Sequence, residues 1–487
     1  MPSDSPAPSS AQPTTSAPAI PQQDRIPLLQ KVMFGMGIPL DYVSTTMMFG
    51  VLWMPYFNIG LGIRPVLLGI VLMCLRSWDC IVDPLIGNLS DNTRTRWGRR
   101  RPFMAVGAVL IAVTYPLFWH IPAAFSERDK IICLIGIGMV YYLFFATWIM
   151  PYYSLQLELT PNYDERTRLS SWMAVIGKLT SMGGGWLLAI LTGKWFIDAS
   201  TGKGSIVLGM QTGCWFIAGG MLIFGMLPTF FVKERYYLTE TSKQAREPFW
   251  QSVRESARCK PLWSLIGISF FLLLGTGAVA GLGQYVNIYY IFDGDLAASA
   301  IVTGVRGTVL TVTGLLSIPL WTWLGERFDK KRMVIGLLLY SMFGHLLNFV
   351  CVRRDMPYLQ ILPAVFESGA MSALWLFLPS MKADTADYDE SNTMRRREGS
   401  LNAFYAWFMK VSSTCATGLG GWVLELSGFN AKVGAQPPEV LRRMFLMYLV
   451  IPVVIWCFAV LIAGVYPLSR RRMAEIRAEL ESRRGAI

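Results

Sequence analysis

Long apolar runs separated by short polar loops make up most of the chain after about residue 25. Each run is about 20 residues or longer, the length an α-helix needs to cross the hydrocarbon core of a bilayer. About twelve such runs can be recognised, and they predict an all-α polytopic membrane protein. The expected membrane spans cover residues 32–57, 64–90, 102–122, 131–157, 169–195, 206–232, 261–290, 299–324, 333–352, 358–381, 399–427 and 443–467.

Composition and charge support a membrane protein. Of the 487 residues 53% are hydrophobic and only 16% are charged, which is too apolar for a soluble enzyme of this size. The net charge of +12 does not indicate nucleic-acid binding, because most Lys and Arg residues lie in short loops between the apolar runs. The eight cysteines are scattered without Cys/His pairing, so we expect neither a disulfide framework nor a metal site.

The chain divides into five predicted parts. Residues 1–24 are rich in Ser, Pro and Ala without the apolar run of a signal peptide, and they predict a disordered cytoplasmic tail. A six-helix bundle is expected over 25–232, a cytoplasmic loop over 233–260 and a second six-helix bundle over 261–468. Residues 469–487 alternate Arg and Glu, as a solvated cytoplasmic tail does.

Two loops of similar chemistry suggest that the halves are repeats. An acidic–glycine–basic pattern occupies residues 87–101, after the second span, and recurs over residues 325–332, after the eighth. Parallel repeats of this kind are typical of the major facilitator fold, whose substrate site lies at the midplane between the halves. The alternative is an ordinary charged turn that occurs twice.

Three charged residues interrupt the second apolar run. Asp79 and Asp83 are four positions apart and therefore share one helix face, with Arg76 one turn earlier. A charge at the bilayer centre costs at least about 2.5–3.5 kcal/mol. These side chains must therefore face a bundle interior or a water-filled cavity, where a moving proton or cation can use them.

In three blocks, the sequence resembles the glycoside–pentoside–hexuronide:cation symporters, a family of the major facilitator superfamily that includes the melibiose carrier. The resemblance covers essentially the whole helical region, and the blocks occur in the family's order and spacing. The blocks are Arg76-Ser-Trp-Asp-Cys-Ile-Val-Asp-Pro-Leu-Ile-Gly87 with Arg96-Trp-Gly-Arg-Arg-Arg-Pro102, Leu159-Thr-Pro-Asn-Tyr-Asp-Glu-Arg-Thr-Arg-Leu169, and Met381-Lys-Ala-Asp-Thr-Ala-Asp-Tyr-Asp-Glu390 with Arg395-Arg-Arg-Glu-Gly-Ser400.

The resemblance implies secondary active transport and assigns roles to matching residues. Asp79 and Asp83 match the paired acids that bind the coupling cation, and Lys410 matches the lysine beside them. Asp41 matches an acid of the first helix that binds sugar hydroxyls, for which a carboxylate is a strong acceptor. An ion pair with Arg76 or Lys410 is the alternative role for Asp41. Further candidates for substrate binding are Arg76 and the aromatic residues Tyr42, Tyr153, Trp375 and Tyr405, which either stack on a sugar ring or only pack.

This sequence departs from the melibiose carrier at the substrate and cation sites. An acid and an arginine that grip the galactoside are replaced by Ile149 and Met173, so a galactoside site is not expected. Oxygen ligands that help to hold sodium are replaced by Val82 and Ala146, although Thr147 is adjacent. A hard cation needs several oxygen ligands, whereas a proton needs only a carboxylate. The substitutions therefore favour H+ as the coupling ion, with Na+ left as the alternative.

Other charged residues have two possible roles. Lys178 and Arg306 either bind an anionic substrate or pair with a membrane carboxylate such as Glu367, and His120 and His345 either relay protons or pack. A last group of charges lies at the cytoplasmic ends of the spans and either closes the inner face through ion pairs or is merely solvated. These gate candidates are Asp91, Arg99, Arg166, Asp384, Asp387 and Arg395.

The sequence therefore predicts a monomeric symporter of the cytoplasmic membrane, without cofactor, for a glycoside, oligosaccharide or uronide. A carrier of a non-sugar solute and a non-transporting sensor on the same fold remain alternatives. An enzyme is not expected, because neither a nucleophile–base pair nor a phosphate-binding loop is recognisable.

Overall fold

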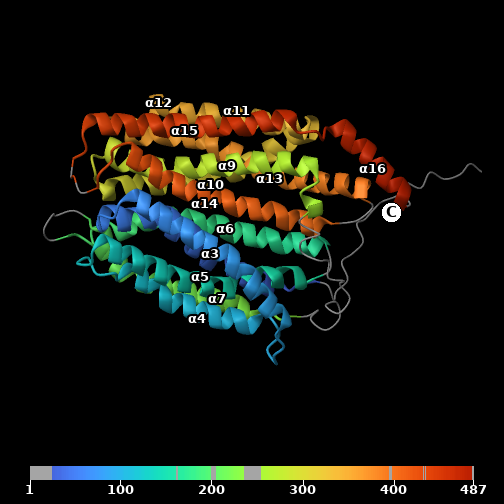
Figure 1. The fold of residues 1–487 in the computed structure, drawn as a ribbon, viewed down its shortest axis with the longest axis horizontal. Helices are drawn as coiled ribbons and strands as arrows, with labels where there is room; N and C mark the ends of the chain where they lie inside the picture. Colours follow the sequence, from blue (N-terminus) through green and yellow to red (C-terminus); the bar gives the residue numbers. More distant parts are fainter. Residues whose placement is uncertain are drawn as a thin grey trace, which may run out of the picture.

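The computed structural model describes residues 25–160, 163–198, 204–234, 254–393, 397–431, 433 and 435–484. Long helices run side by side along the molecule, and the helices of the first half of the chain lie on one side of those of the second half (Figure 1). The predicted C-terminal tail is largely a further helix, α16 (Arg470–Arg484), and the predicted tail at residues 1–24 lies outside the described residues.

The helices coincide with the predicted spans to within a few residues at most ends. Nine helices of the described part are long and apolar enough to cross a membrane, and α13 and α14, with 33 and 29 residues, cover two further predicted spans. The helices after the first span are α3 (Pro65–Asn92), α4 (Arg101–Trp119), α5 (Glu127–Glu158), α6 (Tyr163–Leu191), α7 (Ile206–Phe231), α9 (Lys260–Tyr285), η4 (Val286–Ile291), α10 (Leu296–Arg327), α11 (Lys330–Leu346), α12 (Asn348–Cys351), η5 (Pro357–Gln360), α13 (Ile361–Thr393), α14 (Glu398–Leu426) and α15 (Pro438–Val465).

The first predicted span is not one regular helix. It consists of α1 (Leu28–Gly35), α2 (Ile38–Tyr42) and two π-helical segments, η2 (Val43–Leu52) and η3 (Pro55–Gly60). Proline occupies the first turn of both α2 and η3, where its missing N–H is tolerated. π-Helical turns are rare and often occur at functional sites, and the first π-helical segment begins at Val43, two residues after the candidate ligand Asp41.

Within each half the helices pack mainly on one another. In the first half α4 contacts α5 and α7, and α3 contacts α5; in the second half α9 contacts α14 and α15, and α13 contacts α10 and α11. Two helix pairs make the most extensive contacts between the halves, namely α3 with α14 and α6 with α10. The candidate acids lie on α3 and the candidate lysine on α14, so the first of these seams carries the site.

Glycines allow close approach at both seams. A Cβ added at Gly421 of α14 would lie 2.5 Å from the carbonyl oxygen of Pro65, at the start of α3. At the other seam the Cα atoms of Gly304 and Gly307 in α10 lie within 3.8 Å of the position a Cβ would take at Gly185 of α6. These contacts lie at the end of the molecule opposite the basic loops that precede α4 and α11. We call it the closed end.

Candidate functional site

Two aspartates and a lysine meet at the seam between α3 and α14. The Lys410 ammonium lies 3.7 Å from the Oδ2 atom of Asp79 and donates a hydrogen bond to Oδ2 of Asp83. Asp79 is 5% exposed and Asp83 7%, and among the described residues the Oδ1 atom of neither has a hydrogen-bond partner. The two predicted acids and the predicted lysine are thus brought together, with a free acceptor left on each acid.

A cavity of about 240 Å³ opens beside these residues. Arg76 and Asp79 line it from α3, and Met409, Lys410 and Ser413 line it from α14 together with Thr414. A guanidinium nitrogen of Arg76 lies 4.0 Å from Asp79, so both cations of the cavity approach the same acid. Because the two walls belong to different halves, relative motion of the halves would change the surroundings of the acids.

The side of α3 that carries Val82 is apolar. Val82 and Ala146 are fully or almost fully buried and pack together with Ile86 in one hydrophobic cluster. The adjacent Thr147 hydroxyl donates to the carbonyl oxygen of Leu143 in its own helix, at 2.8 Å. This apolar packing supplies no oxygen ligand for a hard cation.

Removal of the ammonium should weaken coupling. In Lys410→Ala two buried carboxylates lose their shared counter-charge, and the rate of gradient-driven uptake should fall about tenfold or more. Lys410→Arg keeps the charge with a different shape and should retain more of that rate. Initial uptake rates in vesicles with matched protein levels measure the difference, and a Lys410→Ala protein as active as the wild type would show that the ammonium is not needed.

Asp41 lies in a second polar group, formed by α2 and α5. The Tyr153 hydroxyl donates to Oδ2 of Asp41 at 2.7 Å, and Arg76 lies within electrostatic reach of both Asp41 and Asp79. The Arg76 guanidinium also lies 5.7 Å from the ring centre of Tyr142. Arg76 therefore stands between the candidate substrate ligand and the candidate cation site, and the described contacts of Asp41 are with a hydroxyl rather than in an ion pair.

The remaining substrate candidates are distributed over both halves. The Tyr42 hydroxyl lies 3.5 Å from Ser181 Oγ, and the Tyr405 hydroxyl donates to Ser269 at 2.7 Å. Half of the surface of Trp375, on α13, is exposed. The positions that depart from the galactoside pattern, Ile149 and Met173, are buried in the hydrophobic core.

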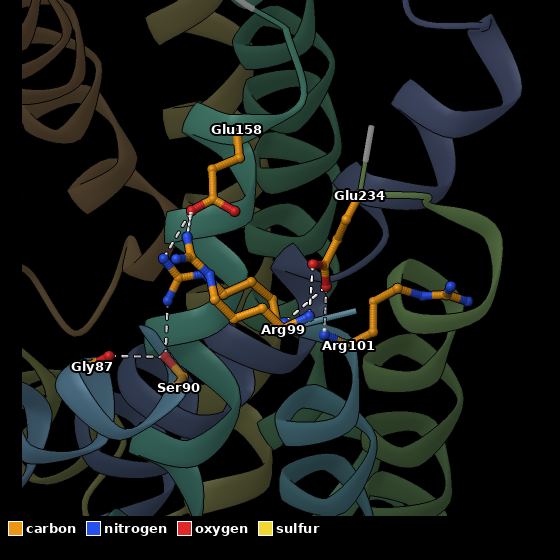
Figure 2. A network of polar contacts seen from close by, with 7 residues as sticks. Gly87, Ser90, Arg99, Arg101, Glu158 and Glu234 are labelled. Atoms are coloured by element: carbon orange, nitrogen blue, oxygen red, sulfur yellow. Dashed lines mark hydrogen bonds and ion pairs between the residues drawn. The ribbon is translucent and has the colours of Figure 1, made fainter. Parts of the chain in front are cut away.

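The loop before α4 is fixed by one carboxylate that no motif in the sequence indicates. Glu234, just after α7, accepts hydrogen bonds from the backbone N–H groups of Arg99, Arg100 and Arg101 at 2.8, 2.8 and 3.0 Å (Figure 2). Gly98 has φ +107° and lies against this carboxylate, which a Cβ would approach to 2.5 Å. A glycine is therefore required here both for the backbone conformation and for the space.

The arginine side chains of this loop bind a second carboxylate, at the end of α5. Glu158 accepts hydrogen bonds from the guanidinium groups of Arg99 and Arg100, the latter at 2.8 Å (Figure 2). Arg100 also donates to Ser90 Oγ of α3 at 2.8 Å. The basic loop thus ties α3, α4, α5 and the end of α7 together within the first half. The only sequence feature that could have indicated this contact is that Glu158 is an acid at the end of a predicted membrane span.

The corresponding loop of the second half makes a similar contact. Lys330, at the start of α11, lies 2.6 Å from Oδ2 of Asp384 on α13. Asp329 accepts from the backbone N–H groups of Lys331 and Arg470, both at 3.0 Å. In each half, then, a base of this loop pairs with an acid in the C-terminal third of the second long helix downstream, as a parallel repeat predicts.

The other gate candidates lie at the same end. Arg166 donates to the carbonyl oxygen of Thr160 at 2.7 Å, and Asp387 lies on α13, one turn beyond Asp384. Asp91 lies in the last turn of α3, but its side chain, like all of Arg395, lies outside the described residues. Closure of this end by these residues stays a prediction.

A buried ion pair at this end also fixes α1. Glu165 accepts from the Ile26 backbone N–H at 2.9 Å and lies 2.5 Å from the Lys31 ammonium. Burial by itself raises the pKa of this carboxyl, but the Lys31 and Ile26 donors outweigh it and hold the pKa below its usual range. This contact joins the start of the interrupted first span to α6.

The fold and the acid–lysine seam define a polytopic membrane transporter. Residues 33–470 match the family model described as "MFS/sugar transport protein". The "Glucuronide carrier protein homolog" of Escherichia coli (strain K12) is 26% identical, with 88% of this chain and 90% of that protein covered. The "Isoprimeverose transporter" of Lactiplantibacillus pentosus is 24% identical, with 92% and 90% covered.

Comparison with solved structures agrees on the fold. An inward-facing, unoccupied bacterial homologue of the human lysosomal transporter Spinster has a TM-score of 0.64 and 12% sequence identity, with 93% of this chain and 97% of that chain covered. The protein therefore belongs to the sugar-transport family of the major facilitator superfamily, and the predicted resemblance to the glycoside–pentoside–hexuronide:cation symporters is confirmed at the level of the family.

Proposed function

We propose that this protein is a secondary active transporter that couples proton entry to the uptake of a glycoside, an oligosaccharide or a uronide by alternating access. It would act as a monomer in the cytoplasmic membrane with both termini in the cytoplasm. The observation that carries the proposal is the contact of Asp79 and Asp83 with Lys410 across the seam between the halves. A cation bound there would be exposed to one side or the other as the halves move.

Apolar packing around Val82 and Ala146 favours a proton over sodium as the coupling ion. An imposed inward pH gradient should therefore drive substrate accumulation by vesicles in potassium buffer without sodium. Uptake from a panel of labelled glycosides and uronides, with each gradient imposed separately, tests coupling and substrate class together. Accumulation that requires added sodium and ignores the pH gradient would overturn proton coupling.

Asp41 is the proposed ligand of the substrate hydroxyls, with Tyr153 holding its carboxylate. Loss of a charge-assisted hydrogen bond costs about 1.5–3 kcal/mol, so Asp41→Ala should weaken substrate affinity about 10–100-fold. Calorimetry of the purified variant measures the affinity, and its melting temperature reports any structural role. Unchanged affinity would end this assignment whatever the stability shows.

A non-sugar solute is the second candidate, because Ile149 and Met173 replace charged ligands of the galactoside pattern and are buried in the core. The same uptake panel separates the two when it includes an amphipathic solute. Transport of that solute without any sugar transport would favour this candidate.

A further inference from the structure

A second buried ionisable cluster lies within the second half. His345 of α11 is fully buried, and its Nδ1 atom lies 2.9 Å from Oε1 of Glu367 on α13. Its Nε2 atom lies 3.0 Å from the backbone carbonyl oxygen of Tyr448 on α15. The other carboxylate oxygen of Glu367 lies 3.5 Å from the guanidinium of Arg306 on α10.

The hydrogen bonds of His345 determine how many protons His345 and Glu367 hold together. A carbonyl oxygen only accepts, so Nε2 must carry a proton to bond Tyr448. The short contact of Nδ1 with Glu367 then needs a second proton, either on the ring as an imidazolium or on the carboxyl as an acid. In both forms the pair contains one proton more than a neutral histidine beside a carboxylate.

Arg306 balances the negative charge that remains on Glu367 when that proton is lost. With the proton bound, the cluster of Arg306, Glu367 and His345 carries one net positive charge. Without it, the guanidinium and the carboxylate balance and the imidazole is neutral. Neither state strands an unpaired carboxylate in the membrane interior, where such a charge is costly. Deprotonation does leave Nδ1 and Oε1 as two facing acceptors, so the contact between α11 and α13 should loosen.

The charged, titratable and polar groups that face His345 and Glu367 lie on the helices packed around them. Arg306 is the cation, and the Tyr448 ring lies 5.0 Å from the imidazole, with Trp456 at 5.5 Å on the same helix. Asn348 donates to the carbonyl oxygen of His345 at 2.8 Å. Tyr448 is the other ionisable group within reach of Arg306.

The cluster is also connected to the seam between the halves. Arg306 lies on the turn of α10 whose glycines, Gly304 and Gly307, approach Gly185 of α6. Its side chain is 22% exposed, whereas His345 is fully buried, so Arg306 is the partly accessible member of the cluster. A movement of α6 against α10 would therefore act on the cation that balances Glu367.

We propose that His345 and Glu367 form a second proton-binding site, within the second half and separate from Asp79, Asp83 and Lys410, with Arg306 as its counter-charge. The inference goes beyond the proposed function, because it concerns a proton held whether or not a sugar is moved.

The chain has only two histidines, which makes the test direct. In His120→Asn protein labelled with 15N-histidine and reconstituted in lipid, every ring nitrogen signal belongs to His345. We expect Nε2 to be protonated throughout, and Nδ1 to change from a protonated or strongly hydrogen-bonded state to a bare one in a single step when the pair releases its proton as the pH is raised. A bare Nδ1 at every pH, an unprotonated Nε2, or a spectrum that never changes would overturn the proposal.

Glu367→Gln in the same background tests the partner. The amide can donate to Nδ1 and keeps the volume of the acid, so the ring should stay neutral with its proton on Nε2 and show no step. Asp79→Asn is the matched control, and its step should keep the wild-type midpoint because the sites are separate. A step that persists unchanged in Glu367→Gln, or one that disappears in Asp79→Asn, would contradict the proposal. Neither measurement uses substrate, so failure of the uptake assay would leave this result standing.

Discussion

Asp79→Asn and Asp83→Asn should each reduce gradient-driven accumulation to the level of passive equilibration. Asparagine keeps the size of the side chain but holds no proton and no charge, and both acids lie beside Lys410 with buried free acceptors. Downhill exchange of substrate should persist, because Asp41 and Tyr153 form a group distinct from the acid pair. Steady-state accumulation and equilibrium exchange, measured in the same vesicles, separate the two effects.

Glu439→Gln is the matched control for these variants, since Glu439 is an exposed acid in the first turn of α15. It should accumulate substrate like the wild type. Normal accumulation by Asp79→Asn or Asp83→Asn would remove that acid from the coupling mechanism. Loss of exchange as well as accumulation would show that the acids also shape the substrate site.

Helix positions were predictable because each membrane span must be apolar over a fixed length, and that constraint is local. The approximate bounds of α3 through α15 follow from it. The irregularity of the first span does not. Pro39 and Pro55 were visible in the sequence, but proline alone does not indicate π-helical turns, and this segment also makes tertiary contacts with α6 and α7.

The acid pair and its lysine were predictable for a different reason. Charges are so costly in hydrocarbon that Asp79, Asp83 and Lys410 had to face the interior, and the family resemblance indicated that they meet. Charged residues outside the hydrocarbon carry no such cost, and their tertiary contacts could not be predicted from the sequence. Glu234 lies outside the membrane spans, and nothing local in the sequence indicates that its carboxylate receives three backbone N–H groups of a loop far away in the chain.

The two histidines also show that tertiary contacts could not be predicted from the sequence. From the sequence His120 and His345 were equivalent candidates for packing or proton relay. In the structure the Nδ1 atom of His120 contacts the Pro116 carbonyl oxygen of its own helix at 2.9 Å. His345 instead contacts Glu367 and Tyr448 on two other helices. These two partners together determine how many protons the imidazole and the carboxyl group hold.

Apart from the contact of Lys410 with Asp83, the hydrogen bonds between the halves among the described residues lie toward the closed end of the molecule. Tyr285 donates to Asn58 at 2.7 Å, and the Trp186 indole donates to Thr308 at 2.9 Å. The Val66 N–H donates to Glu425 at 3.3 Å. At the opposite end the ion pairs described above join helices of the same half. The arrangement of the two halves in this structure therefore depends on close packing at the closed end.

Gly421→Ala should shift the protein away from this arrangement. The new Cβ would lie 2.5 Å from the Pro65 carbonyl oxygen, and backbone cannot yield as the end of a side chain can. Overpacking of this kind costs about 1–3 kcal/mol, which corresponds to a change of about 5–150-fold in the ratio of two conformations. The adjacent Gly420→Ala is the matched control, because a Cβ there meets nothing within 4 Å.

Spin labels at Arg64 and Val433, both exposed and at the closed end, measure this shift. The eight native cysteines are first replaced, and the distribution of distances between the labels is compared among the variants. Gly421→Ala should move the population toward longer distances, whereas Gly420→Ala should match the parent protein. The glycine contact would not control closure if both variants gave the parent distribution. A similar shift in both would instead indicate that α14 tolerates no added methyl group in this region, and that closure does not depend on Gly421 in particular.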